Sequence, residues 1–128
     1  NPVVVNVGNP HIVFFVKNLK KINLKKVGPK IEKLSLFPER INVNFAKILN
    51  NNKIALRVWE RGAGITKACG TGASAATIAA IKNKLINKKT CYVQMEGGEL
   101  KIKYKKNGHI VMTGPIKTIK KGVLNNFF

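Results

Sequence analysis

The residues best suited to chemistry surround Cys69, which stands directly before Gly70-Thr71-Gly72 at the expected start of a helix. Free backbone N–H groups and the helix dipole at such a position favour a thiolate, and they also bind carboxylates or phosphates. We therefore expect the helix start to lower the pKa of the Cys69 thiol. The alternative is a buried structural thiol, which is the commoner fate of cysteine.

The segment Gly70-Thr71-Gly72 on its own is compatible with a tight turn or with a phosphate-binding nest. It is not a P-loop, because no Gly-Lys-Ser/Thr follows it. It is not GxGxxG either, because Ala75 stands where the third glycine would be. The segment therefore matches neither of these nucleotide-binding patterns.

Glu60 and Arg61 form a charged pair at the end of an expected strand, directly before the glycine-rich loop 62–64. Glu60 is a candidate proton partner for Cys69. Arginine is scarce in this chain, and a guanidinium beside a glycine loop is suited to binding a carboxylate through two parallel hydrogen bonds. The pair therefore joins Cys69 in the candidate site.

Two histidines and a second cysteine complete the groups that could transfer protons or bind a metal. We expect His11 in a turn and His109 in a hairpin turn, and we assign Cys91, at the start of a strand, a structural role. A zinc site can be drawn from these three residues and Cys69. Their spacing matches no known ligand pattern, so we predict no metal.

The formal net charge of +19 admits nucleic-acid binding as one interpretation. The basic residues are almost all lysine, however, and Lys, Asn and Ile share A/T-rich codons, so a biased genome would give the same composition. The lysines are scattered in short pairs, and aromatic residues do not interleave with them as on a single-strand binding surface. We favour compositional bias and predict no specific nucleic acid.

The length of 128 residues and the hydrophobic content of 45% fit a single domain, residues 1–128, with a core of its own. No apolar run approaches the roughly 20 residues that a membrane-spanning helix needs, and no secretory signal is visible. Two cysteines are too few for a disulfide framework, so we expect a reducing, cytoplasmic setting. The first residue is Asn1 rather than Met, which favours a processed product or a fragment.

The apolar patterns predict seven or eight strands, one short helix and one long helix. The long helix, residues 71–85, is apolar on most sides and rich in alanine, so we expect it to be buried with strands packed closely around it. The fold class that follows is α/β (α+β), with a curved, mostly antiparallel sheet wrapped around one central apolar helix. The expected strands are 2–7, 12–16, 41–49, 53–60, 91–95, 99–104, 109–113 and 116–123, and the short helix is 24–34.

Residues 41–49 and 53–60 are expected to pair as a hairpin through the turn at 50–52. The first of these strands alternates, with Ile41, Val43 and Phe45 on one face and Asn42 and Asn44 on the other. Because the chain is rich in asparagine, composition is the simplest explanation for polar residues there before any resemblance is considered.

Four segments spread over nearly the whole chain are informative together: Gly8-Asn9-Pro10-His11, Pro38-Glu39-Arg40-Ile41-Asn42, Glu60-Arg61-Gly62-Ala63-Gly64 and Ala68-Cys69-Gly70-Thr71-Gly72-Ala73. Together they resemble diaminopimelate epimerase, in which they occur in the same order. None is specific alone, but the combination is highly specific. The resemblance covers the family's second half only: the family has two similar α/β domains facing each other across a cleft, each with one catalytic cysteine, and the N-terminal domain is absent here.

The resemblance implies interconversion of LL- and meso-diaminopimelate, on the route to lysine and peptidoglycan, without cofactor or metal. One cysteine thiolate removes the α-proton, and the thiol of the other cysteine delivers a proton to the opposite face. Helix N-termini hold the α-carboxylate and stabilise the charge that develops there. The implied partners are the substrate, the missing N-terminal domain and a second copy in a homodimer, with no membrane.

Matching positions imply catalytic roles for Cys69 as acid/base, for Glu60 as its tuning partner and for His11 as the residue that modulates the cysteine of the missing domain. Two departures, Ile12 where Cys is frequent and Ile65 where Glu is usual, concern loop contacts rather than catalysis. The implied substrate contacts are Asn9, Asn42, Glu60, Arg61 and the backbone of Gly70 and Thr71.

Two alternatives stay open. A cofactor-independent racemase of another amino acid would share the thiol chemistry, and label exchange specifically on diaminopimelate would separate the two. A basic nucleic-acid-binding β-domain rests on charge alone, and salt-sensitive retention of DNA or RNA would support it. Because the chain carries one of the two catalytic cysteines, we expect it to be inactive without the other domain.

Overall fold

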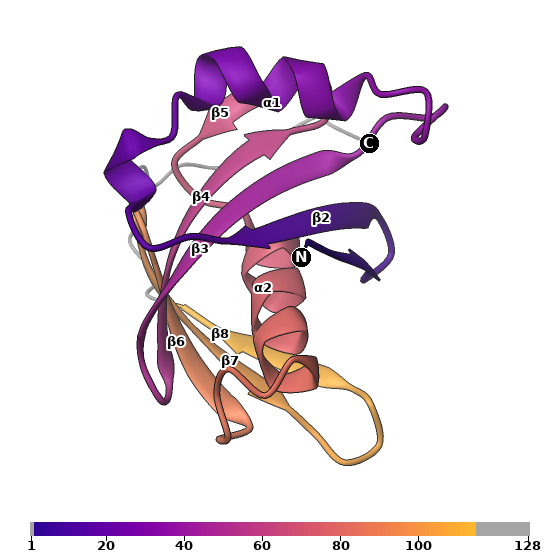
Figure 1. Cartoon of the computed structure of the whole chain (residues 1–128). Coiled ribbons are helices and arrows are strands. Elements are labelled where there is room, and N and C mark those ends of the chain that lie inside the picture. Colours follow the sequence, from indigo (N-terminus) through magenta and orange to yellow (C-terminus); the bar gives the residue numbers. More distant parts are fainter. Residues whose placement is uncertain (1, 115–128) are drawn as a thin grey trace, which may run out of the picture.

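One sheet of eight strands dominates the structure, a computed structural model that describes residues 2–114 (Figure 1). Neighbouring strands follow the order β1-β2-β3-β4-β6-β7-β8, and β5 pairs with β4 outside this path. The strands are β1 (Val3–Asn6), β2 (Pro10–Phe15), β3 (Asn42–Asn50), β4 (Lys53–Glu60), β5 (Gly64–Thr66), β6 (Thr90–Met95), β7 (Gly98–Tyr104) and β8 (Ile110–Thr113).

The sheet curls around helix α2 (Gly70–Lys82), which Figure 1 shows inside the curve. The helix contacts β1 to β4 and β6 to β8, so it is surrounded on most sides. Small residues in α2 let the strands approach the helix closely. The buried residues of the helix are Gly72, Ala73, Ser74, Ala75, Ala76, Thr77, Ala79 and Ala80. The predicted arrangement of a curved sheet around one central apolar helix is confirmed.

Five of the seven strand pairings within residues 2–114 are antiparallel, as predicted. The exceptions are β2–β3 and β4–β6, which are parallel. Parallel neighbours need a long crossover connection. The chain between β2 and β3 and the chain between β4 and β6 are such crossovers, and each contains one of the two α-helices.

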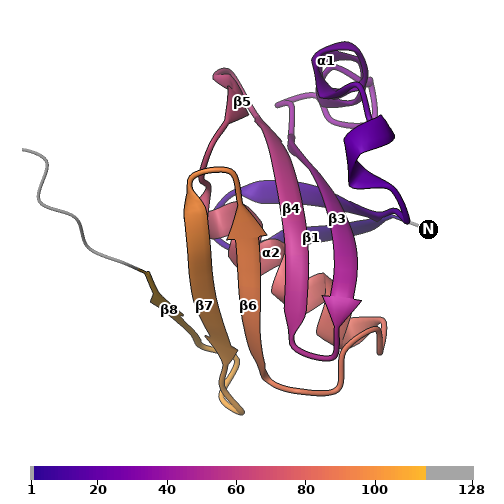
Figure 2. The same cartoon turned by 90° about the vertical axis from the view of Figure 1, so that its left-hand side faces the viewer.

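Helix α1 (Leu24–Glu32) follows the short 3-10 helix η1 (Leu19–Lys21) and packs on β3, β4 and β5, at one end of the sheet (Figure 2). Val43 and Phe45 of β3 cluster with Leu24 of α1, whereas Ala46 belongs to the core around α2. The predicted alternation of the strand is therefore confirmed, and both of its faces are buried over residues 42–46.

Gly28 allows α1 to lie close to the sheet. A Cβ at this position would be 2.5 Å from Cγ of Trp59, which is closer than such atoms approach in proteins. The glycine in the middle of this helix is therefore a packing requirement, and the helix continues through Pro29.

The element ends differ from the sequence prediction in several places. The glycine loop continues into β5, which pairs with β4, and His11 lies within β2 rather than in a turn. Helix α1 ends at Glu32, so Leu34 is exposed. The expected strand 116–123 lies outside the described residues.

Helix α2 ends three residues earlier than predicted. Lys84 adopts a left-handed conformation with φ 59°, and the Leu85 N–H donates to the Ala80 carbonyl at 2.9 Å. This hydrogen bond is typical of a Schellman-type helix end, which the apolar pattern did not reveal. Within residues 2–114, neither α-helix is long and apolar enough to cross a membrane.

Candidate active site

Cys69 is the N-cap residue of α2, with an extended backbone at φ −151° and ψ 105°. Its sulfur takes the place of the usual N-cap oxygen, accepting a hydrogen bond from the Gly72 N–H at 3.3 Å. A Cβ at position 72 would lie 3.2 Å from Cys69 Sγ and 2.7 Å from Asn44 Oδ1. Glycine at position 72 therefore allows the thiol to sit on the first turn of the helix.

The pKa of the Cys69 thiol is raised, so the expectation of a lowered pKa is wrong. The main cause is burial, because the residue is 9% exposed and desolvation disfavours the thiolate. Hydrogen bonds from Thr71 and Gly72 hold the pKa down, and the negative charge of Glu60 raises it further. The helix N-terminus favours the thiolate, but burial outweighs this effect here. At neutral pH the sulfur is therefore a protonated thiol that can donate its proton.

The Thr71 hydroxyl joins Cys69 to the beginning of β2. Thr71 Oγ1 lies 3.0 Å from His11 Nε2, 3.4 Å from Asn9 Nδ2 and 3.6 Å from Cys69 Sγ. His11 is fully buried, and this burial lowers the pKa of its imidazole to about 4. The ring is therefore neutral at neutral pH. The structure brings these four predicted residues together.

Glu60 is the last residue of β4, and β5 holds its side chain. Thr66 Oγ1 in β5 donates a hydrogen bond to Glu60 Oε1 at 2.8 Å. The carboxylate charge adds to the effect of burial on the pKa of Cys69 and opposes the effect of burial on the pKa of His11. The unpredicted strand β5 thus fixes a charge that acts on both groups.

Asn42 ties β2 to the residue that follows β4. Its Nδ2 donates to the Pro10 carbonyl at 2.8 Å, and its Oδ1 accepts from the Arg61 N–H at 2.8 Å. The exposed Arg61 guanidinium donates to the Glu39 carbonyl at 3.3 Å. The amide of Asn42 is therefore already bonded at both ends, whereas the Arg61 side chain is held only at the surface.

Two buried polar residues carry contacts that the sequence analysis did not assign. Asn44 is 0% exposed and donates from Nδ2 to His11 Nδ1 at 3.0 Å. Glu32 is 3% exposed and accepts from Trp59 Nε1 at 2.9 Å. The sequence carries only weak signals for these contacts. Asn44 is a polar residue on an apolar strand, and Glu32 is one of only five acidic residues in a basic chain.

Groups that could bind a small molecule gather at the first turn of α2. The N–H groups of Gly70 and Thr71 have no intrahelical acceptor, because they belong to the first residues of the helix. Asn9 Oδ1 is buried without a hydrogen-bond partner within residues 2–114. Thr71 also lines a cavity of about 380 Å³ between β1, α2 and β8. These donors suit a carboxylate, and the acceptor suits an amino group.

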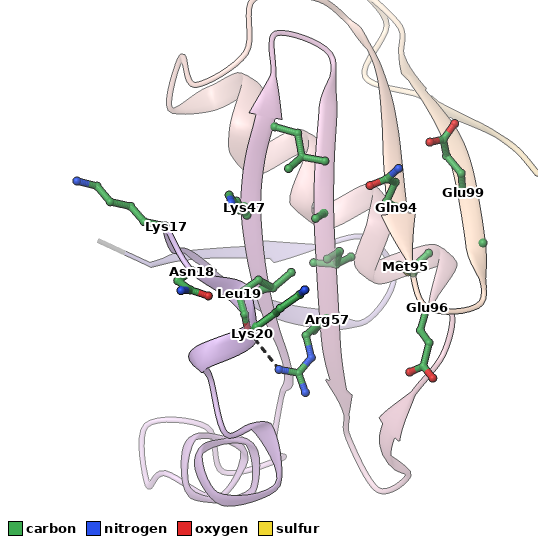
Figure 3. Close-up of a pocket in the computed structure, with 14 residues that line it drawn as sticks. Lys17, Asn18, Leu19, Lys20, Lys47, Arg57, Gln94, Met95, Glu96 and Glu99 are labelled. Atoms are coloured by element: carbon green, nitrogen blue, oxygen red, sulfur yellow. Dashed lines mark hydrogen bonds between the residues drawn. The ribbon is translucent and has the colours of Figure 1, made fainter.

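A cavity of about 830 Å³ lies on the face of the sheet away from α2 (Figure 3). Figure 3 shows Lys17 and Lys20 on one side of it and Glu96 and Glu99 on the other. None of the candidate site residues lines this cavity. The volume of a cavity alone therefore does not identify the candidate active site.

Within residues 2–114, no group of three His, Cys, Asp or Glu side chains could hold a metal ion. Cys91 is fully buried in β6, and His109 is exposed next to β8. The zinc set that can be drawn from the sequence is therefore not assembled.

The family model for "Diaminopimelate epimerase" matches residues 3–119. The chain belongs to the diaminopimelate epimerase family. Three curated relatives carry that name: those of Phocaeicola vulgatus (50% identical over 119 residues), Bacillus pumilus (47% over 123 residues) and Bacillus subtilis (48% over 120 residues). The matches cover 92%, 95% and 93% of this chain.

The same matches cover only 42%, 43% and 42% of the diaminopimelate epimerases themselves. The chain therefore spans less than half the length of the curated relatives it matches.

Solved structures of phenazine biosynthesis proteins share the fold. The protein of Bacillus anthracis superimposes with a TM-score of 0.58 over 88% of this chain and 35% of its own, at 20% sequence identity. The protein of Enterococcus faecalis gives a TM-score of 0.56 over 77% of this chain and 35% of its own, at 16% identity. These likenesses establish the fold alone.

Proposed function

We propose that this chain is the Cys69-bearing half of a diaminopimelate epimerase, which interconverts the LL and meso forms of its substrate. One observation carries the proposal: the Cys69 sulfur caps α2 with Thr71 and Gly72 as hydrogen-bonding neighbours, and Glu60 acts on it electrostatically. The proposed substrate is taken from the name of the relatives, and the Cys69 thiol is the proposed acid/base. The proposed reaction uses no cofactor and no metal, and its proposed location is the cytoplasm.

In the proposed reaction, Cys69 exchanges a proton with one face of the substrate α-carbon. Burial and Glu60 raise the pKa of the thiol, so the protonated form delivers its proton to the carbanion. In the reverse direction, the thiolate that removes the proton is stabilised by the Gly72 N–H and the Thr71 hydroxyl. The free N–H groups of Gly70 and Thr71 bind the α-carboxylate and the charge that develops on it.

The remaining proposed contacts surround this centre. Asn9 offers its unpartnered Oδ1 to an amino group of the substrate. Arg61 binds the distant carboxylate after turning away from the Glu39 carbonyl, and Asn42 supports the backbone of Arg61. His11 modulates the cysteine of the missing domain.

A single cysteine serves one face of the α-carbon, whereas inversion needs an acid and a base on opposite faces. Cys91 does not supply the second group, because it is fully buried and burial raises its pKa to about 11. We propose that the N-terminal domain brings the second cysteine across the cleft. Without that domain the positioning of the substrate, worth about 7–11 kcal/mol, is also largely lost.

The test is an assay of the 128-residue chain with LL-diaminopimelate, following the meso form by chiral chromatography. We expect no conversion above that of the Cys69→Ala variant, which is the matched control for background. Turnover near that of a full-length relative would contradict the proposal. It would mean that a second acid lies within the chain, or that two copies offer Cys69 from both sides.

A further inference from the structure

The buried amide of Asn44 determines which nitrogen of His11 carries the proton. Asn44 Nδ2 faces three acceptors: His11 Nδ1 at 3.0 Å, the Ile12 carbonyl at 3.1 Å and the Asn42 carbonyl at 3.5 Å. Because carbonyl oxygens only accept, this end of the amide is the NH₂ group. His11 Nδ1 therefore accepts, and the proton of the neutral ring lies on Nε2.

The proton on His11 Nε2 in turn determines the direction of the Thr71 hydroxyl. His11 Nε2–H donates to Thr71 Oγ1 at 3.0 Å, and Asn9 Nδ2 donates to the same oxygen at 3.4 Å. A hydroxyl has two acceptor positions and one proton. With both positions occupied, the proton points to the remaining neighbour, Cys69 Sγ, at 3.6 Å.

We propose that Asn44 is a positioning residue which, through His11 and Thr71, directs the Thr71 hydroxyl proton onto Cys69 Sγ. The sulfur then receives two hydrogen bonds, one from this hydroxyl and one from the Gly72 N–H at 3.3 Å. Both bonds favour the thiolate. The network thus offsets part of the effect of burial and keeps the thiol able to cycle between acid and base.

The charged groups that act on this network are Glu60, at the end of β4, and the adjacent Arg61. Glu60 raises the pKa of the Cys69 thiol, whereas the bonds from Thr71 and Gly72 lower it. Substitutions of Thr71 and of Glu60 therefore shift the titration of the same sulfur in opposite directions.

A role of this network in turnover rests on the proposed function. The effect of the network on the Cys69 thiol, however, can be measured without substrate. In a Cys91→Ala background, the rate of Cys69 alkylation is measured against pH to obtain the thiol pKa. We expect Thr71→Val to raise the pKa by about one unit, which slows alkylation about tenfold below that pKa. Thr71→Ser retains the hydroxyl and keeps the original value, whereas Glu60→Gln lowers the pKa.

Nitrogen-15 NMR of the His11 ring in the unsubstituted chain tests the first step. We expect the shifts of a neutral ring protonated on Nε2, and Asn44→Leu is expected to slow alkylation as Thr71→Val does. A ring protonated on Nδ1 would overturn the proposal. Equal thiol pKa values for Thr71→Val and Thr71→Ser would also overturn it, since the hydroxyl proton would then lie on another acceptor such as Asn9 Oδ1. Failure of epimerisation with these thiol results intact would count against the proposed function alone.

Discussion

At the scale of single residues, two cysteines of the same chain have different surroundings although both are buried. Cys69 sits at a helix N-terminus and accepts a hydrogen bond from the Gly72 N–H. Cys91 lies in the middle of the sheet, in β6, with 0% exposure, and its thiol lies 3.8 Å from the Tyr92 carbonyl. The position at a helix N-terminus therefore distinguishes Cys69 from Cys91, and we propose that Cys69 is the reactive cysteine.

Limited alkylation with iodoacetamide at mildly alkaline pH is expected to modify Cys69 before Cys91. Cys69 is partly accessible, whereas burial raises the pKa of Cys91 to about 11 and leaves almost no thiolate. Peptide mass mapping measures the order of labelling. The Cys69→Ala variant should label only in denaturant. Preferential labelling of Cys91 in the folded chain would refute the assignment.

The residue types of the site could be predicted from the sequence, but their chemical states could not. Cys69, Glu60 and His11 stand out because of the segments around them. The direction of the Cys69 pKa depends on burial by strands far away in the sequence, and the proton position on His11 depends on Asn44, which lies 33 residues away. Such contacts leave no local pattern.

At the scale of elements, one carboxylate fastens α1 to the end of β4. Glu32 accepts hydrogen bonds from Trp59 Nε1 at 2.9 Å and from the Gly62 N–H at 3.2 Å, and the Arg40 guanidinium lies 3.7 Å away. The Trp59 hydrogen bond is the main cause that holds the pKa of Glu32 below its usual range. This helix therefore supports the turn that carries Arg61.

Glu32→Gln is expected to lower the free energy of unfolding by about 1–3 kcal/mol at pH 7, because two donors lose a charged acceptor. A carboxyl group whose pKa is lowered by folding stabilises the protein when the pH is above its pKa in the unfolded chain. This stabilisation is lost as the pH falls through the pKa of the group in the folded protein. The difference from the unsubstituted chain should therefore shrink from about pH 5 downward. Urea unfolding across pH 3–8 measures it.

Glu39→Gln is the matched control for the Glu32 experiment, because it removes the same charge from an exposed residue. It should change stability by less than about 0.5 kcal/mol. Equal losses for the two variants would show that net charge, rather than the buried contacts, is responsible.

Most elements could be predicted because their signals are local: alternation in β3 and β4, and the alanine-rich run of α2. Strand β5 is three residues long and contains a glycine, so no periodicity can develop in it. The two parallel pairings depend on where the helical crossovers return the chain, which is a property of the packed molecule. The end of α2 depends on one left-handed residue, Lys84.

At the scale of the whole molecule, a net charge of +19 is carried by scattered lysines and few arginines. We expect weak, non-specific binding of DNA or RNA at low salt from charge alone. Filter binding should show this binding lost at about 0.15 M salt. Tight binding that persists at that ionic strength would contradict the view that composition explains the charge.

We also propose that the molecule presents one half of an active site. The first turn of α2 carries a proton donor and free N–H groups, while the chain spans 42% of its Phocaeicola vulgatus relative. In this proposal Cys69 provides acid/base catalysis on one face of the substrate, and the other face belongs to the part of the enzyme outside this chain.

The most direct test joins this chain to the part of the Phocaeicola vulgatus relative that the match does not cover, and measures conversion of LL- to meso-diaminopimelate. The account predicts that the chimera turns over, that Cys69→Ala lowers its rate at least about 100-fold, and that Cys91→Ala leaves the rate within a few-fold. A folded chimera without turnover, or one whose turnover survives Cys69→Ala, would contradict the account.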